Sequence, residues 1–348
     1  MNIDGKQIGA DCPTYVIAEI GVNHDGSPQR AAELVRAARD AGADAVKFQV
    51  FIGHKLMHTS ARFAEYQKDR VAAADPAAML RQYELSDESF AALAGEAKRC
   101  GLGMIATPFS PDDVPRVASF SGAMKIASPD LINRLLLSKA VDAGLPLIIS
   151  TGAATADEIS STAMWLDRKA ANFALLHCVS SYPVELDEAN LCWIGELATH
   201  ARAVGYSDHT TEICAGALAV MAGADIIEKH LTYDTAAAGP DHSASFSPEQ
   251  FAEYVRQIRL AERMRGTRGR RVLECEKDVR VVSRQSLVLL RDVRSGSVIS
   301  ANDLTTQRPG TGLSAEMSES IVGMRAARDL KAGEMLASAD LKWTFDAA

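Results

Sequence analysis

The sequence predicts an α/β protein: a (β/α)8 TIM barrel followed by a small β-rich domain. Eight short apolar runs alternate with amphipathic segments up to about residue 265, and the tail beyond residue 280 contains an internal repeat instead. Short strands that alternate with helices form parallel sheets. Eight such units in this length fit a closed barrel better than an open doubly wound sheet.

The apolar runs give the barrel strands and the segments between them give the helices. Strands are expected at residues 15–21, 45–51, 103–109, 123–128, 146–152, 173–180, 203–208 and 225–231. The clearest helices are expected at residues 28–41, 86–100, 132–143 and 155–167, several of them followed by a glycine that suits a helix end. We therefore place the barrel in residues 1–268, a linker in 269–283 and the second domain in 284–348.

The tail repeats one short unit. Asp292-Val-Arg-Ser-Gly296 leads to Asp303-Leu304, and Asp329-Leu-Lys-Ala-Gly333 leads to Asp340-Leu341, with a constant offset of 37 residues. Two copies of a turn followed by a strand predict a pseudo-symmetric β-rich domain.

Composition excludes several classes of protein. The 348 residues carry 37 Lys and Arg against 45 Asp and Glu, a net charge of −8, which disfavours general binding to nucleic acids or anionic membranes. No apolar run approaches the ~20 residues of a membrane span, and no secretory signal is visible. The six cysteines include no Cys-x-x-Cys pair, so we expect reduced, mostly buried thiols in a cytoplasmic protein.

Polar residues close nearly every predicted strand. A TIM barrel carries its active site at the carboxyl ends of its strands, so these side chains predict one site. They include Glu19, Lys47, Gln49, Thr107, Lys125, Ser128, Ser150, Ser180, Tyr182, Ser207, His209, Glu228 and His230.

Two lysines lie inside apolar strands, where an unpaired charge is costly. Lys47 and Lys125 either form salt bridges with Glu19 or Glu228, or they capture an anion. The neighbouring Ser and Thr hydroxyls favour a phosphate or carboxylate ligand. We prefer the interpretation that they capture an anion, because both lysines are expected at the same face of the barrel.

Two histidines follow neighbouring strands. His209 and His230 are 21 residues apart, about one βα unit. Two imidazoles on adjacent strand ends can bind a divalent transition metal and leave positions open for water and substrate. The identity of the metal does not follow from these ligands alone.

These strand ends resemble those of the sialic acid synthases, the phosphoenolpyruvate-condensing nonulosonate synthases. The matching segments are residues 18–26 (AEIGVNHDG), 46–49 (VKFQ), 106–109 (ATPF), 125–128 (KIAS), 150–152 (STG), 205–210 (GYSDHT), 228–230 (EKH) and 239–242 (GPDH). The tail, including residues 308–312 (RPGTG), resembles the antifreeze-like (SAF) domain of the same enzymes.

The resemblance implies condensation of phosphoenolpyruvate with an N-acetylated hexosamine (N-acetylmannosamine or a diacetamido-hexose) and water. It also implies a domain-swapped homodimer. Glu19 would stabilise positive charge or position water, and His209 and His230 would hold a divalent metal, usually manganese, with magnesium or cobalt as alternatives. The residues implied to hold phosphoenolpyruvate are Lys47, Gln49, Thr107, Lys125, Ser128, Ser150 and Ser207, and those implied to contact the sugar are Tyr182, Asp241 and, from the partner's tail, Arg308.

Two positions depart from the family pattern. Asp130 stands where a glutamate is common, and Ser180 stands where an asparagine is often found. Both concern the shape of the sugar site, so they leave room for a legionaminic-acid-type product. Two other readings stay open: a class I pyruvate aldolase with Lys125 as its Schiff-base lysine, and a non-catalytic carbohydrate-binding protein.

Overall fold

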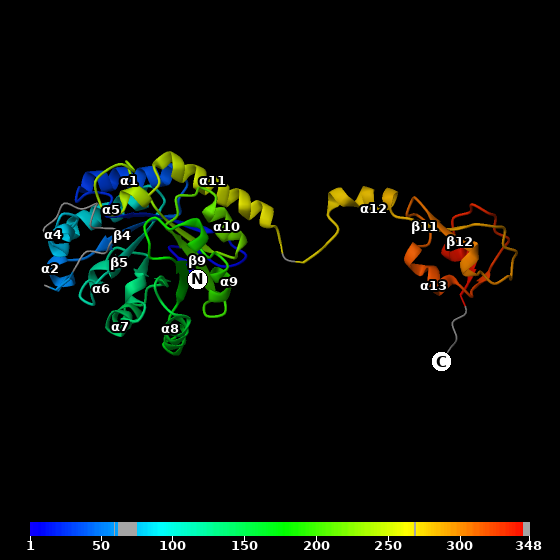
Figure 1. Ribbon diagram of the computed structural model, residues 1–348, viewed down its shortest axis with the longest axis horizontal. Coiled ribbons are helices and arrows are strands. Elements are labelled where there is room, and N and C mark those ends of the chain that lie inside the picture. Colours follow the sequence, from blue (N-terminus) through cyan, green and yellow to red (C-terminus); the bar gives the residue numbers. More distant parts are fainter. Residues whose placement is uncertain (59, 62–74, 268, 344–348) are drawn as a thin grey trace. The chain divides into compact units, whose positions relative to one another are not determined.

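The computed structural model describes residues 1–58, 60–61, 75–267 and 269–343. Contacts within the chain divide it into two compact units, Met1–Gly266 and Thr267–Ala348 (Figure 1). Each unit is described by itself.

The first unit is a closed barrel of eight parallel strands, as predicted. Each strand lies within the predicted run, and β10 pairs with β3 to close the circle. The strands are β3 (Tyr15–Gly21), β4 (Ala45–Val50), β5 (Gly103–Pro108), β6 (Ala123–Ile126), β7 (Leu147–Ser150), β8 (Phe173–Cys178), β9 (Ala203–Asp208) and β10 (Ile226–His230).

The helices of this unit lie outside the strands (Figure 1). The sequence fixes several of their starts, because the side chain of Ser27 caps one helix and Thr155 forms a capping box with Glu158 in another. They are α1 (Pro28–Asp40), α2 (Gly53–Leu56), α4 (Pro76–Arg81), α5 (Asp87–Arg99), α6 (Val114–Ala118), α7 (Arg134–Asp142), α8 (Ala156–Arg168), α9 (Trp193–Leu197), α10 (Ala215–Met221) and α11 (Pro248–Arg265).

The barrel interior changes from apolar to polar along the strands. Ile17, Ile105 and Ile148 are fully buried in an apolar cluster that also contains Ile3 and Ile8 from the N-terminal segment with β1 (Asn2–Ile3) and β2 (Lys6–Gln7). Side chains alternate faces along a strand, so the residue two positions later points into the same interior. At those positions the chain places polar side chains, among them Glu19, Thr107 and Ser150. The apolar layer therefore supports a polar floor at the carboxyl ends of the strands.

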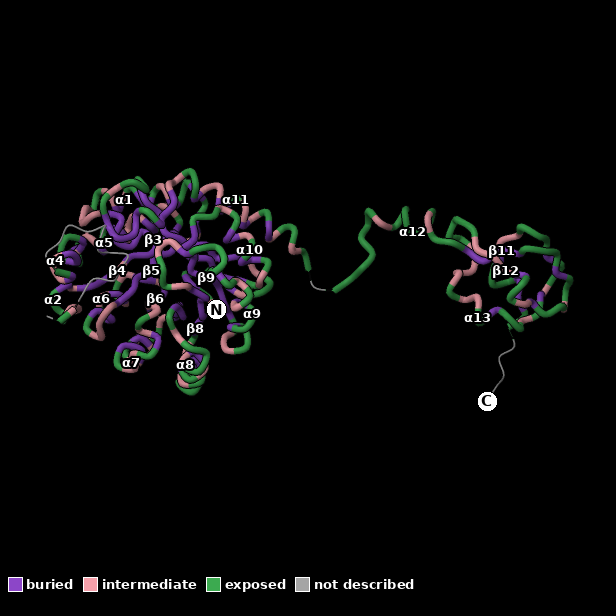
Figure 2. Tube along the Cα trace, viewed as in Figure 1, coloured by how far each residue is buried: buried purple, intermediate pink, exposed green. Residues whose placement is uncertain are grey.

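A second apolar layer packs the outer face of the sheet against the helices. It is the larger of the two, and its strand side includes Val46, Phe48 and Ile149. Figure 2 shows the same division, with buried strands and helices that are exposed on their outer sides. Burial on both faces explains why these strands read as continuous apolar runs in the sequence.

The second unit is built from two equivalent halves, as the repeat predicted. β11 (Ser286–Leu289) pairs with β12 (Leu304–Gln307), and β13 (Arg325–Ala326) pairs with β14 (Leu341–Lys342). Leu289 lies opposite Leu304 and Ala326 lies opposite Leu341, with the 37-residue offset preserved on both strands.

The two halves also meet at equivalent positions. The backbone N–H groups of Val293 and Leu330 each donate to the other's carbonyl, at 2.9 and 2.8 Å. This unit further contains α12 (Lys277–Ser283) and α13 (Ser318–Ile321). The segment expected as a linker, residues 269–283, therefore includes a short helix, none of whose residues is buried.

The expectation of mostly buried thiols was wrong. Cys178 is buried, Cys12 and Cys100 are half-buried, and Cys192, Cys214 and Cys275 are exposed, all six as free thiols. Cys192 and Cys214 directly precede α9 and α10, where the chain has already left the sheet for the outer surface. Within the described residues, no helix has the length and apolarity needed to cross a membrane.

Candidate active site

A pocket of about 350 Å³ opens at the carboxyl ends of the barrel strands. All but two of the predicted site residues line it. They are Glu19, Lys47, Gln49, Thr107, Lys125, Ser128, Ser150, Ser180, Tyr182, Ser207, His209, His230 and Asp241.

The two exceptions are Asp130 and Arg308. Asp130 ends a short 3-10 turn, is half-buried, and accepts a hydrogen bond from Asn133 Nδ2 at 2.9 Å. Its carboxylate thus contacts the start of α7 and is not among the lining residues. Arg308 is an exposed residue of the second unit, and its role stays a prediction.

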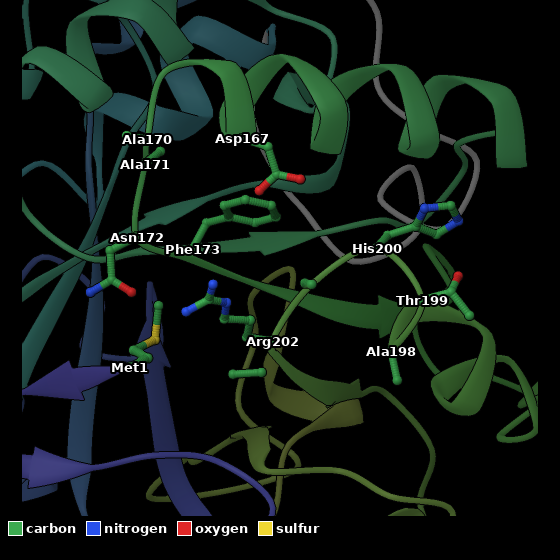
Figure 3. Close-up of a pocket in the computed structure, with 12 residues that line it drawn as sticks. Met1, Asp167, Ala170, Ala171, Asn172, Phe173, Ala198, Thr199, His200 and Arg202 are labelled. Carbon is green, nitrogen blue, oxygen red and sulfur yellow. The ribbon is translucent and has the colours of Figure 1, made fainter.

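A larger hollow of about 810 Å³ lies at the opposite end of the barrel, where β8 and β9 begin. Figure 3 shows it with Asp167, His200 and Arg202 at its edge. None of the predicted site residues lines it. A TIM barrel carries its chemistry at the other face, so the smaller pocket is the candidate active site.

Charged side chains form the floor of the active-site pocket. Lys47 Nζ lies 3.1 Å from Glu228 Oε1 and 3.3 Å from Glu19 Oε1. Gln49 Nε2 donates to Glu19 Oε1 at 3.0 Å. β3, β4 and β10 supply these residues, so the closure of the barrel brings them together.

The second lysine extends this network. Lys125 Nζ donates to Ser150 Oγ at 2.6 Å and lies 3.8 Å from Glu228 Oε1. Ser207 Oγ donates to the same carboxylate oxygen at 2.9 Å. The salt bridges expected for the lysines are therefore present. Both lysines line the pocket, and their capture of an anion stays a prediction.

The environment separates the pKa values of the two carboxyls. Burial raises the pKa of Glu19 to about 7, although Lys47 opposes the shift. Burial acts in the same direction on Glu228, but Lys125 and Lys47 outweigh it and lower its pKa to about 2. Glu228 is thus ionised at neutral pH, whereas Glu19 gains or loses its proton close to neutral pH.

The lysines differ in the same way. Burial lowers the pKa of Lys125 to about 8, and Glu228 only partly offsets the effect. Burial also acts against the charged form of Lys47, but Glu19 and Glu228 outweigh it and raise the pKa. Lys47 is therefore charged at neutral pH, and Lys125 loses its charge at a lower pH than an ordinary lysine does.

Several buried polar atoms at the floor lack a hydrogen-bond partner. They are Glu19 Oε2, Thr107 Oγ1 and Glu228 Oε2. Buried polar atoms are normally satisfied, so these three remain free to form a hydrogen bond with water or with a ligand in the pocket.

The two histidines lie side by side at the rim of the floor. Their ring centroids are 5.5 Å apart, and the ring of Tyr182 lies 4.0 Å from that of His209. His209 Nδ1 lies 2.9 Å from the carbonyl oxygen of Val179, which can only accept a hydrogen bond, so this contact favours a proton on Nδ1. Burial acts against the charged ring of His209, but Cys178 and this carbonyl outweigh it and raise the pKa.

His230 presents an unsatisfied nitrogen. Its Nδ1 atom is buried without a hydrogen-bond partner and lies 3.7 Å from Asp241 Oδ2. Burial and the nearby His209 hold the pKa of His230 well below its ordinary value, so the ring is neutral, as metal coordination requires. Among the described residues no group of three or more His, Cys, Asp or Glu side chains has metal-site geometry. That His209 and His230 hold a divalent metal stays a prediction.

Glu228 was expected as a strand-end residue and as a possible salt-bridge partner of the lysines. It is the shared counter-charge of both lysines, and it faces the pocket two residues before His230 on one strand. Two functional features were missing from the predicted site. Cys178 also lines the pocket, with its Sγ atom 3.8 Å from His209 Nδ1.

The second missed feature is an apolar wall along one side of the pocket. It comes from α2, α4 and the loops near them and forms its own hydrophobic cluster. Its members in the pocket are Val22, Phe51, Leu56, Met57, Met79, Leu80, Tyr83 and Phe109. Most lie in the long connection between β4 and β5, where no strand end marks them as functional.

Comparison with known proteins identifies the family. The NeuB family pattern matches residues 34–270, and the SAF domain pattern matches residues 284–342. The chain belongs to the NeuB family. The expected SAF domain is confirmed as well.

Several relatives of this NeuB-family chain are named as synthases of nonulosonic acids. It is 38% identical over 339 residues to the N,N'-diacetyllegionaminic acid synthase of Legionella pneumophila, covering 95% of each chain. The Campylobacter jejuni enzyme of that name is 35% identical, with 93% of this chain and 98% of that one covered. A solved N-acetylneuraminic acid synthetase from Leptospira borgpetersenii matches with a TM-score of 0.74 and 31% identity, over 80% of this chain and 94% of that one.

The family membership confirms the prediction of an enzyme, a C–C bond-forming synthase of the N-acetylneuraminate synthase type. It also removes the reading of a non-catalytic carbohydrate-binding protein. Which substrates the enzyme takes is a separate question.

Proposed function

We propose that this enzyme condenses phosphoenolpyruvate with the open-chain aldehyde of an acylated hexosamine and water, giving a nine-carbon 2-keto acid and phosphate. The observation that carries the proposal is the pair of buried lysines at the pocket floor, in a protein with a net charge of −8. A local cationic floor lined by hydroxyls suits a small ligand that bears both phosphate and carboxylate.

The floor offers phosphoenolpyruvate a matched set of partners. Lys47 and Lys125 supply charge, and Ser150 already lies 2.6 Å from Lys125 Nζ. Thr107 Oγ1 is buried and unsatisfied, so it gains a hydrogen bond when an anion enters. Gln49, Ser128 and Ser207 complete the predicted contacts.

The proposed reaction forms one C–C bond and breaks one C–O bond. The methylene carbon of phosphoenolpyruvate attacks the aldehyde carbon, and positive charge develops on the carbon that bears the phosphate. Glu19 lies at the floor with an unsatisfied Oε2 atom, where it can stabilise that charge or orient the water that adds to the carbon. The tetrahedral product expels phosphate, and the oxygen from water becomes the keto oxygen.

His209 and His230 would hold a divalent metal, which we propose to be manganese. When bound, such an ion supplies Lewis-acid polarisation of the aldehyde oxygen. The chain's own contribution is to keep His230 neutral and to hold the two imidazoles side by side, with Tyr182 against His209 and Asp241 near His230.

We infer that the sugar is uncharged and carries apolar substituents. Of the described residues that line the pocket, Lys47 and Lys125 are the only Lys or Arg, and both are used at the floor. The apolar wall instead suits acyl methyl groups or a deoxy carbon. The names of the two diacetyllegionaminic acid synthases support a diacetamido-hexose as the sugar.

We also propose a cytoplasmic homodimer in which the SAF domain acts on the partner's barrel through Arg308. The free thiols agree with a reducing compartment. Mixing Arg308→Ala protein with protein inactivated at Lys125 tests the swap. Recovered activity in the mixture supports it, and no recovery indicates action within one chain.

Release of phosphate tests the proposed reaction. The enzyme is incubated with phosphoenolpyruvate, manganese and a panel of acyl-hexosamines, with and without chelator. We expect release with a diacetamido-hexose, and its loss with chelator. A folded, metal-loaded protein that releases no phosphate with any sugar of the panel would overturn the proposal.

One observation favours a second candidate function, that of a class I aldolase. Burial lowers the pKa of Lys125 to about 8, which makes its amine available for a Schiff base with pyruvate, as in a class I aldolase. Borohydride reduction in the presence of pyruvate, followed by mass spectrometry of the peptide containing Lys125, distinguishes the two. The aldolase reading predicts a stable adduct, and the synthase reading predicts none.

A further inference from the structure

A buried ion pair lies on the outer side of the barrel, directly behind the two histidines. Lys229 Nζ is 3.4 Å from Asp208 Oδ2, and both side chains are fully buried. His209 and His230 line the pocket, so the alternation along each strand turns the residues before them outward. Asp208 and Lys229 are also register partners of β9 and β10. The pair therefore ties the two strands together one residue before each histidine.

The same two side chains fix the backbone on the far side of His209. Asp208 Oδ1 accepts a hydrogen bond from the Thr210 N–H at 2.8 Å, and Lys229 Nζ donates to the Thr210 carbonyl. His209 is thus bracketed, because the residue before it and the residue after it are both held by the ion pair.

The backbone of His230 is held from the same side. Lys229 Nζ lies 4.2 Å from the centroid of the Phe246 ring, and the Phe246 N–H donates to the His230 carbonyl at 2.9 Å. From α11, Tyr254 Oη donates to Asp208 Oδ2 at 2.8 Å, which fixes the carboxylate against the helix layer. One connected group of contacts reaches both histidines without entering the pocket.

Stability alone does not explain such a pair. Removing two charges from water is costly, and well-packed apolar residues of similar volume often serve a core equally well or better. A buried pair does fix geometry, since its partners have few alternative arrangements. Metal affinity depends on such geometry, and loss of an outer partner of a ligand typically costs 10- to 100-fold.

We propose that Asp208, Lys229 and Tyr254 form a positioning element that sets the separation and ring orientation of His209 and His230. The expected effect on metal affinity rests on the proposed metal site, but the claim about the arrangement of the two rings concerns the chain alone. These three are positioning residues, because none of them lines the pocket.

The first test measures metal binding. Asp208→Asn and Tyr254→Phe are titrated with Co²⁺, whose visible spectrum reports ligand geometry. Thr162→Val is the matched control, since it removes a buried hydrogen bond, Thr162 Oγ1 to the Leu131 carbonyl, from a helix outside this group. We expect about 10-fold weaker binding and an altered spectrum at saturation for Asp208→Asn, a smaller effect for Tyr254→Phe, and neither for Thr162→Val. Affinity and spectrum equal to wild type in both variants would overturn the proposal.

The second test needs no metal. Imidazole ¹⁵N resonances of His209 and His230, assigned with His209→Gln and His230→Gln, are compared among the same variants. We expect both resonances to shift in Asp208→Asn and Tyr254→Phe and to stay in place in Thr162→Val. Unchanged resonances would overturn the positioning role. If wild-type protein binds neither Co²⁺ nor Mn²⁺, the metal proposal fails, and this measurement still decides the geometric claim. Tyr254→Phe keeps the ion pair intact, so it provides a folded variant should Asp208→Asn fail to fold.

Discussion

Lys47 Nζ lies 3.1 Å from Glu228 Oε1, although the two residues are only 5% and 3% exposed. The same carboxylate lies 3.8 Å from Lys125. One buried glutamate thus serves as counter-charge for two lysines, and Glu19, 3.3 Å from Lys47, is the second carboxyl of the floor. We expect both the stability of the ligand-free protein and its affinity for phosphoenolpyruvate to depend on this group of charges.

We predict that Glu228→Gln destabilises the ligand-free protein by about 3–5 kcal/mol, because it leaves two buried lysines without their shared counter-charge. Thermal denaturation monitors the change. Glu274→Gln, which breaks an exposed pair with Lys277, is the matched control and is expected to change stability by less than about 1 kcal/mol. Equal melting temperatures for both variants would contradict the central role of Glu228.

Loss of a floor lysine weakens substrate binding. We predict that Lys125→Ala raises the Kd for phosphoenolpyruvate about 10- to 100-fold, since it removes a charge-assisted contact of about 1.5–3 kcal/mol. Calorimetric titration measures the affinity, and Lys139→Ala on the exposed side of α7 is the control. An unchanged Kd in Lys125→Ala would show that the anion binds elsewhere.

Glu19 makes stability depend on pH. Its folded pKa of about 7 is above the ordinary value of 4.5, so its contribution is fully present below pH 4.5 and is lost as pH rises through 7. We predict that the unfolding free energy of wild type falls between pH 5 and 8 relative to Glu19→Gln, by at most about 3 kcal/mol.

Glu228 has the opposite effect on the change of stability with pH. Its folded pKa is lowered to about 2, so its contribution is present above pH 4.5 and is lost as pH falls toward 2. Denaturation of wild type and Glu19→Gln across pH 5 to 8 isolates the Glu19 effect, because Glu228 stays ionised throughout. Parallel curves for the two proteins would show that Glu19 ionises normally.

Gly152 has no room for a side chain. A Cβ atom there would lie 2.4 Å from Ser180 Oγ, 2.9 Å from Ser128 Oγ and 3.1 Å from Cys178 Sγ, all of which line the pocket. We predict that Gly152→Ala keeps the fold but lowers kcat/KM at least 10-fold.

Gly95 provides the comparison for that variant. It lies inside α5, and the nearest atom to its added Cβ is a flexible arginine nitrogen at 3.6 Å. Gly95→Ala should keep full activity and gain a little stability, since alanine favours a helix interior over glycine by about 1 kcal/mol. Full activity in Gly152→Ala would mean that this corner of the pocket does not contact the substrates.

The barrel could be predicted from the sequence because its strands are buried on both faces. Each strand therefore appears as an unbroken apolar run, and the polar residue that ends it marks the active face. His209 was predicted in this way, and Lys47 was predicted as a charged residue inside such a run. The SAF unit was also visible, because its two halves repeat the same residues 37 positions apart.

Other features depend on contacts that no local pattern shows. Glu228 was one of two possible partners of the lysines in the sequence, and only barrel closure shows that it pairs with both. Met79 and Leu80 read as ordinary core residues of a connecting helix, but they line the pocket. The pair of Asp208 and Lys229 appears only when β9 and β10 are set in register.

The fate of one oxygen atom tests the proposed reaction most directly. The enzyme is given phosphoenolpyruvate labelled with ¹⁸O at the oxygen that joins carbon to phosphorus, together with the sugar that supports phosphate release in the panel assay. The masses of both products are then measured by mass spectrometry. We predict that the label leaves entirely in the phosphate and that the keto acid is the sugar extended by three carbons. Label retained in the keto acid, or no extended sugar at all, would contradict the condensation.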